Sequence, residues 1–157
     1  MLKKTLVFFF LLNSFSMGTS YIIYPKEKFL NYSEKFEYEL KFFAQYFPST
    51  MRYSALKRLE KEYHRNIFEK IENINCYKAK IKNQVIEDIK MEEEIWKEYN
   101  KHQEDLLSDL YYRRGGTAWR RYMVDYFFEE TLINRIKTHI LLLETLDELD
   151  KYYKESH

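Results

Sequence analysis

Apolar residues recur every three or four positions along most of this chain, which is the spacing of one face of an α-helix. The first stripe follows Ser33, which is placed to cap a helix, and it ends before Pro48, which disfavours helical geometry at the preceding residue. Ser49 or Thr50 can cap a second helix, which is predicted to end near residues 73–75. The inward positions expected in these two helices are Phe36, Leu40, Phe43 and Phe47, then Leu56, Leu59, Tyr63, Ile67 and Ile71.

The longest stripe runs over residues 76–112 and predicts one long helix. The Arg-Arg-Gly-Gly sequence at 113–116 should end it, because cations favour a helix C-terminus and glycine readily adopts left-handed geometry. Thr117 can cap the next segment, and a last helix is predicted over residues 127–153. The expected inward positions are Ile81, Val85, Ile89, Trp96, Tyr99, Leu106 and Leu110, then Leu132, Ile136, Ile140, Leu143, Leu146 and Leu149.

These stripes predict an all-α fold, an antiparallel bundle of about four helices in which neighbouring helices cover each apolar face. The composition agrees, because three glycines and two prolines in 157 residues favour long helices and few turns. Residues 21–157 are expected to form a single helical domain, since their number is typical of one domain and no linker or repeat divides them.

The N-terminal residues follow a different pattern. Lys3 and Lys4 precede an unbroken apolar run over residues 6–12, and small residues then follow at Ser14, Ser16, Gly18 and Ser20. This layout predicts a cleaved signal peptide at residues 1–20, so the mature chain is expected to be secreted or periplasmic. The apolar run is shorter than the about 20 residues that span a bilayer, so no stable membrane insertion is expected after cleavage.

Cysteine content and charge limit the partners. Cys76 is the one cysteine, so no intramolecular disulfide can form; a dimer linked through Cys76 is an alternative, but an inert thiol is the favoured interpretation. Loss of Lys3 and Lys4 reduces the 26 basic residues to 24, against 25 acidic residues. This balance gives no reason to expect nucleic acid as a partner.

Catalytic and metal-binding signatures are weak. The histidines His64, His102, His139 and His157 are scattered, and no two have the i, i+4 spacing of a helical zinc pair. The acidic run at 92–94 is expected to be a solvated face, and His139 a boundary or core residue. No nucleophile or phosphate-loop motif is present, so we expect no enzyme activity, no catalytic residue, no metal site and no cofactor.

Several residues nevertheless occur in a familiar order. They are Leu56, Leu59 and Tyr63, then Trp96 and Tyr99, then Gly115, Gly116 and Thr117, and finally Leu132 with Arg135. This order resembles the LprI-like lysozyme-inhibitor family, whose members carry a leucine, asparagine and tyrosine helix, a tryptophan helix, a Gly-Gly-Ser/Thr loop and a closing threonine-arginine helix. The resemblance covers about residues 54–146.

The chain also departs from that family pattern. Glu60 stands in place of the family's asparagine, and Glu93 and Glu94 in place of its alanine-glutamine pair. Asn100 and Lys101 replace an arginine-aspartate pair, and the family's paired cysteines are absent. The resemblance therefore rests on the order of the landmarks.

The resemblance implies a small secreted helical domain and, for some members, inhibition of lysozyme, which is binding and not catalysis. A glycosidase cleft contains two carboxylates, so an inserted basic loop can pair with them and exclude the sugar. The best such loop here comprises Arg113, Arg114, Gly115, Gly116 and Thr117, with Trp119 close by in the sequence. In the alternative interpretation the arginines only complement a helix end and the glycines only turn the chain.

Two functions of different class are therefore expected. One is a secreted or periplasmic binding protein whose partner is a lysozyme. The other is a structural or host-directed interaction module that docks an unidentified protein through an aromatic and basic surface, because Tyr, Trp and Arg concentrate binding energy at interfaces. This surface comprises Tyr111, Tyr112, Arg113, Arg114 and Trp119. A near-neutral charge slightly disfavours the first, since an acidic surface would steer a cationic lysozyme better.

Overall fold

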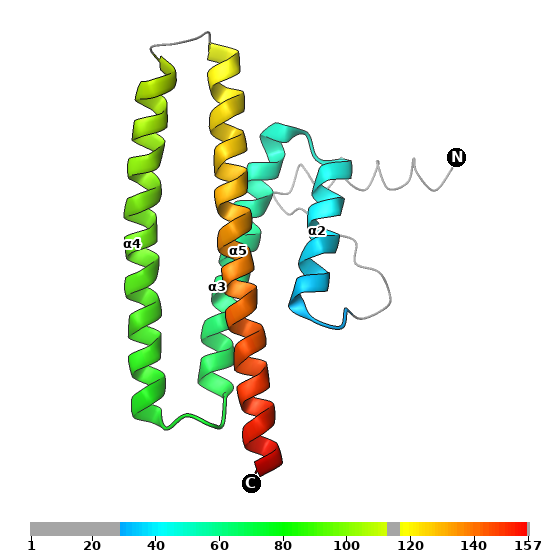
Figure 1. The fold of residues 1–157 in the computed structure, drawn as a ribbon, viewed down its shortest axis with the longest axis vertical. Coiled ribbons are helices and arrows are strands. Elements are labelled where there is room, and N and C mark those ends of the chain that lie inside the picture. The colour runs from blue at the N-terminus through cyan, green and yellow to red at the C-terminus, as the bar shows by residue number, and fades with distance from the viewer. Residues whose placement is uncertain (1–28, 113–116, 157) are drawn as a thin grey trace, which may run out of the picture. The chain divides into compact units, whose positions relative to one another are not determined.

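The computed structural model describes residues 29–112 and 117–156, and this part of the chain is entirely helical (Figure 1). It contains four helices and no strand, which confirms the all-α prediction for the described residues. The helices are α2 (Tyr32–Tyr46), α3 (Ser49–Asn73), α4 (Ala79–Tyr112) and α5 (Thr117–Ser156). The chain divides into two compact units, residues 1–47 and 48–157. The predicted signal peptide at 1–20 lies outside the described residues.

The first unit contributes α2. The prediction that Ser33 caps this helix is wrong: Asn31 is the N-cap, and its side-chain oxygen accepts a hydrogen bond from the Glu34 amide at 2.8 Å. The helix ends as predicted, because Phe47 adopts extended geometry (ψ 132°) before Pro48. Aromatic rings pack along one side, with the Phe43 and Phe47 centroids 5.3 Å apart.

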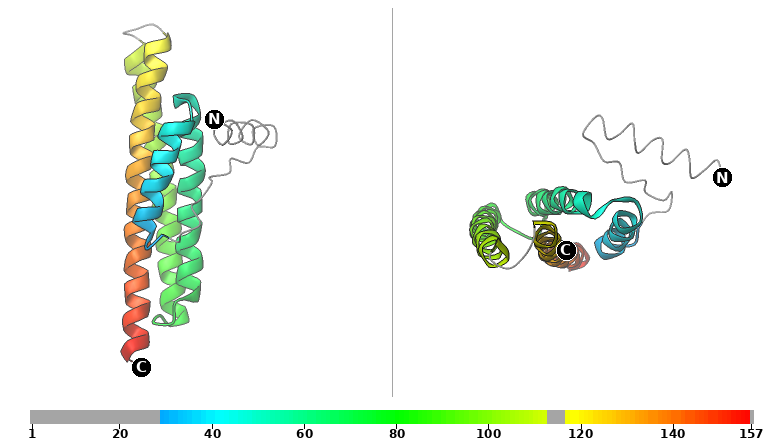
Figure 2. Two further views of the ribbon diagram at one scale, coloured as in Figure 1. Left: turned by 90° about the vertical axis from the view of Figure 1, so that its right-hand side faces the viewer. Right: turned by 90° about the horizontal axis from the view of Figure 1, so that it is seen from above.

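The second unit consists of α3, α4 and α5, in which α4 runs antiparallel to α3 and α5, and α3 and α5 run in the same direction (Figures 1 and 2). Pro48 is the N-cap of α3 and makes no side-chain capping bond, so the expectation that Ser49 or Thr50 caps this helix is wrong. A short segment joins α3 to α4. In this segment the side chain of Ile74 is buried, and its amide donates to the Lys70 carbonyl at the end of α3. The Asn75 amide donates to Asp150 of α5 at 3.2 Å.

The core of the second unit lies mainly between α3 and α5. The predicted inward stripe of α3 is confirmed, and that of α5 is confirmed except for Leu149, which is 41% exposed. The prediction for Leu149 is wrong because Asp150 takes the next inward position after Leu146, four residues on, and turns Leu149 toward solvent. The buried apolar residues of this unit are Ala55, Leu56, Leu59, Tyr63, Ile67, Ile71, Ile74, Phe128, Leu132, Ile136, Ile140, Leu143 and Leu146.

The prediction for α4 is wrong at several positions. Its expected core residues Ile81, Tyr99, Leu106 and Leu110 are exposed. Within this unit α4 has neighbours on one side only, so α3 and α5 cover a narrower strip than the apolar stripe occupies. Periodicity alone predicts a helix with an apolar face, and it does not supply the partner that would bury that face.

Helix bounds differ modestly from the predictions. The long helix begins at Ala79, later than expected, and α5 begins at Thr117, ten residues before the predicted start. Among the described residues, no helix combines the length and apolar character needed to cross a membrane.

Candidate functional site

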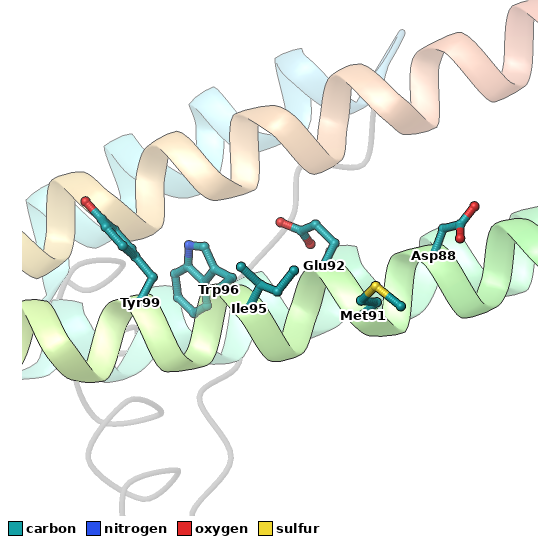
Figure 3. A pocket seen from close by; sticks show the side chains of 6 residues that line it. All are labelled: Asp88, Met91, Glu92, Ile95, Trp96 and Tyr99. Atoms are coloured by element: carbon teal, nitrogen blue, oxygen red, sulfur yellow. The ribbon is translucent and has the colours of Figure 1, made fainter.

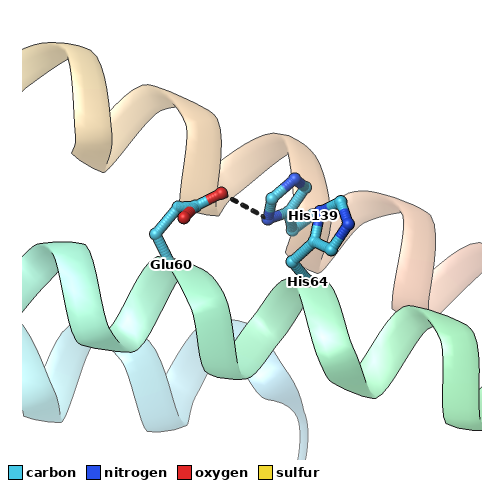
Figure 4. Close-up of side chains that lie close together, drawn as sticks. All are labelled: Glu60, His64 and His139. Carbon is cyan, nitrogen blue, oxygen red and sulfur yellow. Dashed lines mark ion pairs between the residues drawn. The ribbon is translucent and has the colours of Figure 1, made fainter. Parts of the chain in front are cut away.

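A cluster of charged and polar side chains lies among the three helices of the second unit. This polar cluster comprises Glu60 and His64 of α3, Glu93 of α4, and Arg135 and His139 of α5. Helices α3 and α5 each contribute two residues spaced i, i+4, which places both members of a pair on one helix face. The two faces meet, and Figure 4 shows Glu60, His64 and His139 converging between α3 and α5.

Arg135 donates hydrogen bonds to both carboxylates of the polar cluster. Its Nε donates to Glu60 Oε1 at 3.1 Å, and its two terminal nitrogens donate to both oxygens of Glu92 at 2.7 and 3.0 Å. One of those nitrogens also donates to Glu93 Oε2 at 2.5 Å. The guanidinium lies over the Trp96 ring, 4.2 Å from its centroid. The side chain of Arg135 therefore links all three helices through charge-assisted and cation–π contacts.

Two of the carboxylates that bind Arg135, those of Glu60 and Glu93, have pKa values shifted in opposite directions. Burial raises the pKa of Glu60, and the neighbouring charge of Glu93 adds to this, so that the bond from Arg135 does not restore the ordinary value. Burial also raises the pKa of Glu93, but hydrogen bonds from Lys97 and Arg135 outweigh this effect, so the pKa of Glu93 is lower than its ordinary value. The negative charge of the cluster is thus held most firmly on Glu93.

The two histidines have ring nitrogens without hydrogen-bond partners. His139 is 5% exposed, and burial, assisted by the charges of Arg135 and His64, lowers its pKa to about 4, so the ring is neutral at neutral pH. Its Nδ1 lies 4.0 Å from Glu60 Oε1, while His64 Nδ1 lies 3.6 Å from Glu93 Oε2. Both distances exceed a hydrogen bond, and both Nδ1 atoms are buried without a hydrogen-bond partner among the described residues.

The acidic run at 92–94 differs from the prediction. Glu92 and Glu94 are exposed, as expected of a solvated face, but Glu93 is half-buried, and both Glu92 and Glu93 bind Arg135. His64 also lies beside Glu93. The expectation failed because Arg135 is far away in sequence and reaches this run only through the packing of α5 against α4.

A second feature lies on the solvent side of α4. Met91, Ile95 and Tyr99 are 61%, 62% and 54% exposed and follow one another at intervals of four residues. We call these three residues the outer face of α4. A shallow pocket of about 370 Å³ lies along this helix, and Figure 3 shows the side chains that line it: Asp88, Met91, Glu92, Ile95, Trp96 and Tyr99. The outer face is therefore an apolar row beside acidic and aromatic side chains.

The charge along this part of α4 is one-sided. Residues 85–110 contain nine acidic residues and three lysines, a formal charge of −6, whereas the whole chain carries +1. Most of these acidic side chains are exposed. The near-neutral balance of the chain thus conceals a strongly acidic helix.

The binding loop expected from the sequence lies largely outside the described residues. Arg113, Arg114, Gly115 and Gly116 belong to the segment that connects α4 to α5. Thr117 is the first residue of α5, and Trp119 lies in its first turn. Cys76 is a half-buried free thiol.

Sequence reasoning missed the polar cluster. No two histidines have the i, i+4 spacing of a zinc pair, but Glu60 and His64 on α3 do. The spacing of Glu60 and His64 can be recognised in the sequence. The sequence does not show that Arg135 and His139 lie beside this pair, because that depends on the packing of α5 against α3.

Comparisons with protein-family models, with curated proteins and with solved structures found no match. The function is therefore argued from the geometry and charge of this chain.

Proposed function

We propose that this chain is an exported, non-catalytic binding protein that docks a basic protein surface on the outer face of α4. The observation that carries the proposal is the exposed row Met91, Ile95 and Tyr99 on a helix segment of formal charge −6. Contiguous exposed apolar side chains framed by charged ones are typical of protein interaction sites.

The outer face has the chemistry of an interface centre. Methionine and tyrosine are enriched at interfaces, and Met91 has the flexibility to fit an irregular partner surface. Trp96, next to this row, is held by the guanidinium of Arg135, which is itself fixed by carboxylates. A surface supported in this way loses little side-chain freedom on binding, so more of the contact energy becomes affinity.

The acidic character of α4 selects the partner. A field of this sign steers a cationic protein toward the helix and repels acidic ones. Lysozymes of the cationic type satisfy this requirement, and the landmarks that resemble the LprI-like family point to the same class of partner. Two of those landmarks, Trp96 and Arg135, contact each other, which supports the comparison, whereas Glu60, which also binds Arg135, departs from the family pattern.

The connection after α4 supplies a second element in this proposal. The acidic helix would orient a lysozyme, and the basic loop from Arg113 to Thr117, with Trp119, would enter the cleft and pair with its carboxylates. The alternative partner is another basic protein that uses only the outer face of α4 and leaves the loop free. This alternative rests on the apolar row alone, because Met91, Ile95 and Tyr99 all lie on α4.

The direct test is lysis of a peptidoglycan suspension by several lysozyme types, with and without the purified protein. We expect slowing at near-stoichiometric ratios for the cationic types. Arg113→Ala together with Arg114→Ala should abolish the slowing at an unchanged melting temperature if the loop enters the cleft. Absence of slowing with every lysozyme type would overturn lysozyme as the partner.

A further inference from the structure

We infer that Glu60, His64 and His139 form a binding site for one divalent ion of the zinc type between α3 and α5. One ligand atom from each residue lies within 4.8 Å of the ligand atoms of the other two. The site goes beyond the proposed binding function and does not depend on it. Metal sites in helical bundles are commonly built this way, from side chains that project inward from facing helices.

The unpartnered nitrogens are the observation that points to a ligand. His64 Nδ1 and His139 Nδ1 are both buried, and neither has a hydrogen-bond partner among the described residues. Buried polar atoms in folded proteins are nearly always paired, because an unpaired one forfeits the hydrogen bonds it had in water. His139 Nδ1 lies 4.0 Å from Glu60 Oε1, so a metal ion held by these two residues would satisfy it. The ring of His64 packs beside that of His139, with centroids 5.2 Å apart, and can supply the third ligand (Figure 4).

The ligand set matches zinc. Two imidazole nitrogens and one carboxylate oxygen are a known three-residue zinc set, and it leaves a fourth position for water or another ligand. Zinc–ligand distances of about 2.0–2.2 Å place neighbouring ligand atoms roughly 3.3 Å apart in a tetrahedron. The ligand atoms now lie within 4.8 Å of one another, and His139 Nδ1 is 4.0 Å from Glu60 Oε1, so binding requires the three side chains to move closer together.

The charged residues around the site leave a net negative charge for a cation, although Arg135 is itself positively charged. Glu60, Glu92 and Glu93 carry three negative charges, and the cations bound to them are Arg135 and Lys97, so the local balance is −1. Arg135 donates to Glu60 Oε1 and leaves lone pairs on that carboxylate for a metal. Hydrogen bonds of this kind orient carboxylate ligands in metal sites, so Arg135 is a positioning residue here. The low pKa of His139 keeps its ring in the neutral form that binds metal.

The experiment is calorimetric titration of the metal-free full chain with ZnCl₂, and titration with CoCl₂ followed by visible absorption. We expect one Zn²⁺ per chain, a rise in melting temperature with the metal, and the intense absorption of tetrahedral Co²⁺. His64→Gln and His139→Gln should each weaken binding roughly tenfold or more, because each removes a ligand.

Matched variants separate this site from adventitious binding. His102→Gln removes an exposed histidine of α4, and Cys76→Ser removes the thiol; both should bind Zn²⁺ as the unaltered chain does. His64 is less buried than His139, so the His64→Gln variant tests the site even where His139→Gln fails to fold. Absence of Zn²⁺ binding by the unaltered chain, or equal binding by folded His64→Gln, would overturn the inference. Neither result bears on lysozyme binding.

Discussion

Arg135 is the residue whose contacts reach furthest through the second unit. It is buried, donates to three carboxylates and covers the Trp96 ring. A buried ion pair adds little net stability when complete, but removing one partner leaves a buried charge without compensation. Loss of Arg135 would affect Glu60 most, because the carboxylate of Glu60 is itself buried.

Replacement of Arg135 by methionine should therefore destabilise the fold by about 3–5 kcal/mol. The added variant Glu60→Gln in the same chain should recover part of this loss, because it removes the uncompensated charge. The exposed Arg65, paired with Glu69, is the matched control, and Arg65→Met should change stability by about 0.5 kcal/mol or less. Urea unfolding followed by circular dichroism measures all three. An equal effect of the Arg65 and Arg135 variants would contradict the role given to Arg135.

Asp150 provides a pH-dependent contact at the same scale. The hydrogen bond from Lys154 lowers its pKa, and the Asn75 amide and the charge of Lys70 act in the same direction. Because the pKa is lower in the folded chain than in the unfolded one, the ionised group stabilises the fold at pH values above about 3.8. That contribution is lost as the pH falls through the folded pKa.

Asp150→Asn should accordingly lower the melting temperature at pH 7, and the difference from the unaltered chain should shrink as the pH falls below 4. Thermal melts at a series of pH values measure this difference. Asp109, on the exposed side of α4, is the matched control, and Asp109→Asn should show no such convergence. A difference between Asp150→Asn and the unaltered chain that stays constant down to pH 3 would contradict the interpretation.

At the scale of the elements, the three helices of the second unit differ in how much of their apolar surface they bury. The stripes of α3 and α5 face each other, whereas α4 leaves Met91, Ile95 and Tyr99 in solvent. The stability of this unit therefore rests mainly on the contact between α3 and α5. The exposed row of α4 is free to serve binding.

Matched isoleucine substitutions test this division. Ile67→Ala, in the buried stripe of α3, should cost about 2–5 kcal/mol, because it leaves a cavity in the core. Ile95→Ala, on the outer face of α4, should change stability by about 0.5 kcal/mol or less. Chemical denaturation of the two variants gives the comparison. A similar loss in both would mean that Ile95 is a core residue.

The sequence predicted the elements better than it predicted their neighbours. The stripe from Leu56 to Ile71 identifies the buried face of α3 because it is covered along its whole length. The stripe of α4 has the same spacing, yet much of it is exposed, since periodicity carries no information on whether a partner lies opposite. The polar cluster joins residues 75 positions apart, Glu60 and Arg135, so only the packing of α5 on α3 reveals it.

The helices of the second unit contribute differently to stability and to binding. The contact between α3 and α5 supplies stability, and the polar cluster at that contact fixes Trp96 through Arg135. Trp96 then supports the acidic outer face of α4, where we place the binding of a basic protein. This division predicts that binding can be removed without loss of the fold.

The measurement that tests this claim most directly is the dissociation constant for a cationic lysozyme, compared between Ile95→Glu and Leu141→Glu. These variants add the same charge at side chains that are 62% and 66% exposed, on α4 and α5. We expect Ile95→Glu to weaken binding by tenfold or more, about 1.4 kcal/mol, with an unchanged melting temperature, and Leu141→Glu to leave binding intact. Equal affinities for the two variants, or no binding by the unaltered chain, would contradict the assignment of lysozyme binding to the outer face of α4.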